Sequence, residues 1–83
     1  MINMLTYEEK TQLGSLQIGM HFSYGGNVYH IDDRTETQPY YMVTPIGRIV
    51  HQHGGPQFMK LGKRHPHLLP KSLVVKKVSL TQA

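Results

Sequence analysis

The chain has 83 residues, of which 39% are hydrophobic, and its nine Lys and Arg against five Asp and Glu give a formal net charge of +4. A chain of this length buries only about 60% of the surface that its unfolded form exposes, so we expect a single domain over residues 1–83 and exclude multidomain enzymes and repeat arrays. The absence of cysteine excludes disulfide scaffolds, thiolate nucleophiles and thiolate metal sites. No apolar run approaches the ~20 residues of a membrane helix, and the N-terminus lacks a basic leader, which predicts a cytoplasmic protein without a membrane partner.

The two parts of the chain differ in charge. Residues 1–36 hold all five acidic side chains and two basic ones, whereas residues 37–83 hold seven basic side chains and no acidic one. A stretch without carboxylates cannot neutralise its own cations. It therefore meets either the acidic N-terminal part within the fold or an anionic partner outside it.

The N-terminal residues carry the signals of a short helix. Thr6 followed three residues later by Glu9 has the form of a capping box, and Gly14 suits the position after a helix end. We expect a helix over about 7–13, within a capped segment 5–14. A helix this short is not stable alone, so it must dock on the rest of the domain.

From Gly19 the pattern changes to alternating apolar and polar residues, which is typical of strands. The alternation predicts strands at about 20–24 and 27–32, with Gly25 and Gly26 in the turn of a hairpin. The polar residues 32–39 predict a loop.

A second hairpin is predicted next. Strands at 40–44 and 48–53 are joined by Thr44-Pro45-Ile46-Gly47, in which Pro45 and Gly47 occupy the positions that a type I turn favours. The following residues 54–72 contain three prolines, which lack the donor that strand pairing needs, so they predict a long irregular basic loop. Residues 73–80, rich in Val and Leu, predict the last strand.

Five short strands at this spacing predict a mainly β protein. We expect a small five-stranded barrel over 19–80, of SH3-like or OB-like type, with the N-terminal helix over an open end. The SH3-like form is favoured because the first four strands make two tight hairpins. The free edge of such a sheet offers a route to a homodimer.

The main candidate site is the basic part of the chain. Cations on a proline-stiffened loop that runs into a strand are suited to contact the phosphates of a nucleic acid. The candidate anion-binding residues are Arg48, Lys60, Lys63, Arg64, Lys71, Lys76 and Lys77. Phe58, or one of Tyr40 and Tyr41, would supply a surface on which a base stacks. The alternative is a solvated basic surface, and the chain contains no RNP, KH or helix-turn-helix signature.

Histidine is frequent, with six residues that include two His-x-His pairs. On a strand, His51 and His53 would project from one face, and His65 or His67 would add a third imidazole for a metal ion. No carboxylate lies near either pair in the sequence to orient the rings. The interpretation we favour is therefore exposed histidines, with no metal or other cofactor.

Catalysis is not expected. The paired carboxylates Glu8-Glu9 and Asp32-Asp33 diverge on either kind of element, and no nucleophile elbow, P-loop or dinucleotide fingerprint is present. The sequence thus predicts a non-enzymatic nucleic-acid-binding module. The alternative is a protein-binding adaptor or inhibitor with an acidic target surface, such as a phage or mobile-element accessory protein that blocks a host factor.

Overall fold

The computed structural model describes residues 3–34, 37–52, 55–62 and 64–82, and it confirms the mainly β prediction. These residues form one antiparallel sheet of seven strands, not five, and within them the only helical element is a 3-10 turn, η1 (Leu13–Ser15). The strands are β1 (Asn3–Gln12), β2 (His21–Tyr24), β3 (Asn27–Arg34), β4 (Tyr40–Gln52), β5 (Gly55–Lys60), β6 (His67–Pro70) and β7 (Val74–Gln82).

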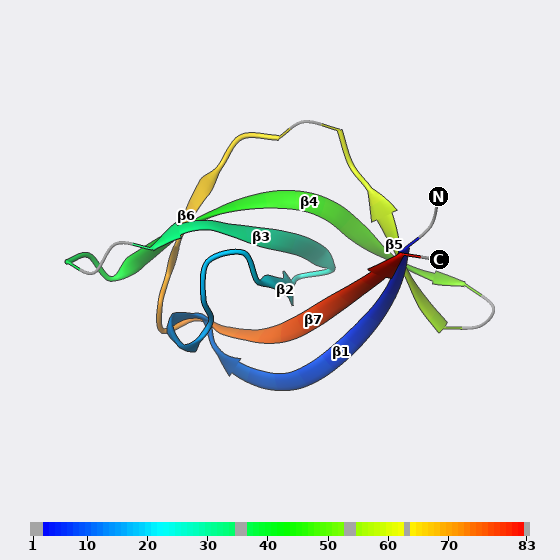
Figure 1. Cartoon of the computed structure of the whole chain (residues 1–83), viewed down its shortest axis with the longest axis horizontal. Helices are drawn as coiled ribbons and strands as arrows, with labels where there is room; N and C mark the ends of the chain where they lie inside the picture. The colour runs from blue at the N-terminus through cyan, green and yellow to red at the C-terminus, as the bar shows by residue number, and fades with distance from the viewer. Residues whose placement is uncertain (1–2, 35–36, 53–54, 63, 83) are drawn as a thin grey trace.

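The sheet is strongly curled but does not form the closed barrel that we expected. Its strand order is β3-β2-β7-β1-β5-β4-β6, and β3 also pairs with β4. Figure 1 shows β3 and β4 along one side of the molecule and β1 and β7 along the other, meeting at the end where β5 lies. In the described residues, β1 meets β5 at two residue pairs only, Asn3 with Phe58 and Met4 with Gln57. The sheet is therefore open along most of this seam.

The predicted N-terminal helix is wrong. Residues 3–12 form β1, which pairs with β7 from Asn3 opposite Gln82 to Gln12 opposite Val74. A capping box stabilises a helix end by local hydrogen bonds, whereas the partner strand lies at the far end of the sequence and leaves no local signal. Pairing with β7 at residues 3–7 and 10–12, on either side of a register shift, ties β1 into the sheet, whereas an isolated two-turn helix is marginal in water.

The first predicted hairpin is confirmed. β2 and β3 pair from His21 opposite His30 to Tyr24 opposite Asn27. Gly25 and Gly26 make the turn with φ of 62° and 84°, which residues with a Cβ rarely adopt. β3 continues to Arg34, so the polar segment predicted as a loop begins inside a strand.

The second predicted hairpin is wrong, because β4 runs without a turn for 13 residues. Opposite it, Val28 pairs with Gly47 and Tyr29 pairs with Pro45, which leaves Ile46 as an extra residue in β4. This is a β-bulge, one of the few places in a sheet that accept proline. The Ile46 carbonyl accepts a hydrogen bond from the Leu61 amide at 3.0 Å. Pro45 and Gly47 therefore mark a bulge and not a turn.

The segment predicted as an irregular loop contains two further strands. β5 begins with Gly55 and Pro56, and β6 ends at Pro70. Proline lacks a donor, but sheets accept it on edge strands and close to strand ends, and β6 lies at the edge of the strand order. The prolines therefore bound these strands rather than preventing them.

Two hydrophobic clusters stabilise the fold. The larger contains Leu13, Leu16, Phe22, Ile31, Tyr41, Val43 and Val75, and the smaller contains Val28, Phe58 and Val78. The Tyr41 hydroxyl is 2.9 Å from the Gly14 carbonyl oxygen and 3.2 Å from that of Leu16, so it donates to the chain around η1. The ring of Phe58 covers Gly47, where an added Cβ would lie 1.8 Å from a ring carbon.

Candidate anion-binding site

The aromatic residues predicted to stack on a base are mostly part of the core. Tyr41 is 1% exposed and Phe58 is 5% exposed, so neither can meet a partner, and their assignment as stacking residues is wrong. Tyr40 is 43% exposed, as the alternation of side chains along a strand requires next to a buried Tyr41. Of the three, Tyr40 alone faces solvent.

The predicted basic residues do not form one continuous patch. Lys76 and Lys77 lie on β7, which β1 separates from β5 in the strand order. Lys60 ends β5 and is exposed. Lys63 lies outside the described residues. The segment 60–77 therefore distributes its cations over different parts of the surface.

Two of the predicted residues meet in a small cleft, which we call the arginine cleft. Arg48 projects from β4, Arg64 from the segment after β5, and His67 begins β6. The cleft has a volume of about 230 Å³, and its lining is Asn27, Tyr29, Pro45, Arg48, Leu61, Arg64 and His67. The Ile46 bulge contributes to it, because the hydrogen bond from Leu61 holds the start of the Arg64 segment against β4.

Lys71 has a structural role. Its Nζ lies 5.4 Å from the centre of the Tyr41 ring, and its carbonyl accepts the Gly14 amide at 2.8 Å. An added Cβ on Gly14 would lie 3.1 Å from the Lys71 Cβ, so the two chain segments are in close contact. Lys71 thus ties the turn before β7 to η1 and to the buried tyrosine.

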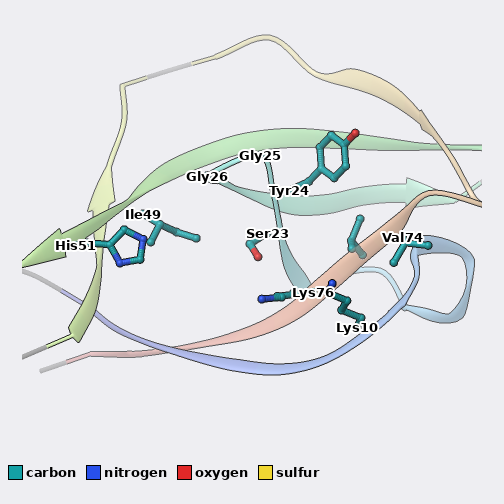
Figure 2. Close-up of a pocket in the computed structure, with 10 residues that line it drawn as sticks. Lys10, Ser23, Tyr24, Gly25, Gly26, Ile49, His51, Val74 and Lys76 are labelled. Carbon is teal, nitrogen blue, oxygen red and sulfur yellow. The ribbon is translucent and has the colours of Figure 1, made fainter.

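A second hollow lies at the open seam of the sheet, and we call it the seam hollow (Figure 2). It has a volume of about 470 Å³ and takes Lys10 from β1, His51 from β4 and Lys76 from β7. Lys10 and Lys76 are directly opposite each other in the β1–β7 register. Sequence reasoning missed Lys10 because it assigned this residue to the helix and to the acidic part of the chain.

The four histidines considered as metal ligands are not brought together. His51 lines the seam hollow, His67 lines the arginine cleft and His65 is exposed, while His53 lies outside the described residues. Within the described part of the chain, no group of three or more His, Cys, Asp or Glu side chains is placed to hold a metal ion.

A different histidine pair is in contact. His21 and His30 face each other across β2 and β3, with ring centres 5.2 Å apart. The His30 Nδ1 lies 2.8 Å from one Asp32 carboxylate oxygen, and the Thr44 hydroxyl donates to the other oxygen. Burial, and after it the charge of His30, lowers the pKa of His21 below its ordinary 6.5. The sequence signal was the cross-strand register of the confirmed hairpin, which places these two positions opposite each other.

Comparison with protein-family models, with curated proteins and with solved structures finds no match for this chain. No helix among the described residues has the length and apolar character to cross a membrane.

Proposed function

We propose that this protein is a small, non-enzymatic nucleic-acid-binding module of the cytoplasm that holds phosphate groups in the arginine cleft. The observation that supports this proposal is the meeting of Arg48 and Arg64, 16 positions apart in the sequence, in one concave site beside His67. Small curled sheets of the SH3-like or OB-like type commonly bind nucleic acids on one face and its flanking loops, and we infer the same use here.

The chemistry of the cleft suits a phosphodiester. A guanidinium presents a planar set of N–H donors that matches two phosphate oxygens, and it keeps its charge at every physiological pH. Among the described residues that line the cleft none is acidic, and the Asn27 amide adds a neutral donor. Such a site contacts the backbone and not the base edges, so it predicts binding with little sequence preference.

The test is the salt dependence of oligonucleotide binding. We expect fluorescence anisotropy with a labelled oligonucleotide to show an affinity that falls steeply as salt rises, and Arg48→Gln and Arg64→Gln each to reduce the log–log slope by about 0.7–1. Lys10→Gln is the matched control, because it removes the same charge from an exposed position in the seam hollow. Absence of binding at low salt, or an equal effect of Lys10→Gln, would contradict the proposal.

An apolar surface supports a second candidate function, binding of an acidic protein. On the β4–β6 pair, Met42 is opposite Leu68, and Tyr40 lies on the same face two residues away. Their exposed fractions are 41%, 59% and 43% respectively. Because Arg64 before β6 and Lys71 after it are cationic, the partner that fits is a protein surface with apolar side chains rimmed by carboxylates.

One capture experiment separates the two candidates. If the protein alternative holds, a stoichiometric partner captured from lysate survives nuclease treatment, is lost with Leu68→Ser and is retained with Arg64→Gln. If the nucleic-acid proposal holds, nuclease releases what is captured, and Arg64→Gln weakens capture whereas Leu68→Ser does not.

A further inference from the structure

We propose that His21 and His30 form a binding site for a divalent transition-metal ion of the zinc class on the β2–β3 hairpin. The site is independent of the arginine cleft and uses none of the His-x-His histidines. Imidazole nitrogen is a ligand that suits Zn²⁺, Cu²⁺ and Ni²⁺.

The spacing of the two rings fits a shared ion. With Zn–N bonds of about 2.0–2.1 Å, about 1.1–1.2 Å from nitrogen to ring centre and a tetrahedral angle, two imidazoles on one ion have centres about 5.2 Å apart. The His21 and His30 ring centres are 5.2 Å apart, and the planes are inclined at 55°. Directly opposed positions on an antiparallel pair hold the Cβ atoms about 4.5–5.5 Å apart, which keeps the two side chains within reach of one ion.

Asp32 sets which nitrogen of His30 is available. The carboxylate can only accept, so the contact at 2.8 Å requires His30 to donate from Nδ1, which leaves the lone pair of the neutral ring on Nε2. A carboxylate behind a ligating histidine is the usual second partner of a metal site, since it fixes the ring and raises its basicity. The Thr44 hydroxyl in turn donates to the other oxygen of Asp32, so both carboxylate oxygens have a partner and the carboxylate is held in place behind His30.

Metal ligation requires the neutral form of both imidazoles, so binding should weaken as pH falls. Both rings are half-buried, so solvent reaches the site. The protein supplies two ligands, consistent with the absence of a three-residue cluster among the described side chains, and water occupies the remaining positions.

The experiment is a titration of the full chain with Zn²⁺ by calorimetry at pH 7.5, in wild type and variants. We expect one site per chain, loss of at least tenfold in affinity for His21→Gln and for His30→Gln, and a weakening of about 10–100-fold for Asp32→Asn. The matched controls His51→Gln and His67→Gln alter histidines of the two His-x-His pairs and should retain the wild-type affinity.

Nitrogen chemical shifts of the imidazoles give a second reading on the unaltered protein, independent of whether a variant folds. Zn²⁺ should move the ring nitrogens of His21 and His30 and leave those of His51 and His67 in place. The proposal is overturned if the wild type shows neither heat nor shifts, or if His51→Gln or His67→Gln weakens binding as much as His30→Gln does.

Discussion

Replacing Gly47 by alanine tests the packing of the smaller core cluster. Gly47 lies on β4 beneath the ring of Phe58, which is itself packed with Val28 and Val78. An alanine Cβ at this position would stand 1.8 Å from Phe58 Cε2 and 2.3 Å from Cζ. Gly47 and Phe58 are both buried, so the Phe58 ring cannot swing into solvent to relieve the overlap with the new Cβ.

The expected cost follows from these distances. Carbon atoms in contact are normally about 3.5–4.0 Å apart, so the Phe58 ring must withdraw by roughly 1.7 Å or more. Overpacking of a core costs about 1–3 kcal/mol, and complete loss of a buried phenylalanine costs about 3–5 kcal/mol. We therefore expect Gly47→Ala to reduce the free energy of unfolding by about 2–4 kcal/mol, a large part of the roughly 4–12 kcal/mol typical of a chain of this length.

The assay is urea unfolding followed by circular dichroism, with Gly62→Ala as the matched control. A Cβ on Gly62 meets nothing within 4 Å, so this variant should stay within about 0.5 kcal/mol of wild type or gain slightly. If Phe58 causes the loss, Gly47→Ala should cost much less in a Phe58→Leu background. A loss below about 0.5 kcal/mol, or equal losses in both backgrounds, would refute the packing argument.

Three further outcomes are expected. Tyr41→Phe removes the donor that the Gly14 and Leu16 carbonyls share, so urea unfolding should show a loss of about 1–3 kcal/mol, whereas Tyr24→Phe on the exposed surface should change little. Because the folded state lowers the pKa of His21, the stability that its neutral ring contributes is complete above the ordinary pKa of 6.5 and is lost as pH falls through the lowered pKa. The unfolding midpoint should therefore drop less between pH 7 and 5 in His21→Gln than in wild type. Equal drops in the two proteins would contradict this reasoning. Combining Arg48→Gln with Arg64→Gln should reduce the salt slope of oligonucleotide binding by about 1.4–2 and leave the unfolding midpoint nearly unchanged.

The sequence predicts those elements whose signals are local. The β2–β3 hairpin is correct because two glycines with positive φ and the alternation beside them lie within a dozen residues. β1 is predicted wrongly because its partner β7 is about 70 residues away, whereas the nearby signals, the capping-box pattern at Thr6 and the glycine at Gly14, favour a helix. The Pro45 pattern is compatible with both a turn and a bulge, and the pairing of β4 with β3 on both sides of Ile46 decides between them.

The same distinction applies to the site. The excess of cations after residue 37 follows from counting, but which of them meet depends on the path of the chain. Arg48 and Arg64 converge because β5 returns along β4, whereas Lys76 is carried away on β7. The burial of Tyr41 and the exposure of Tyr40 could be expected as a pair, although the sequence could not say which of the two lies inside.

The pairing of Asn3 with Gln82 has a consequence for how the protein folds. β1 is synthesised before the other described strands, yet its partner along nearly its whole length is the last of them. On the ribosome β1 therefore has no partner until β7 has been made. Refolding must likewise bring together two strands that are separated in the sequence by all the other described strands. Such topologies fold in milliseconds to seconds rather than microseconds. We expect the fold to form as a single event once β7 is available, without an independently stable part that contains β1 alone.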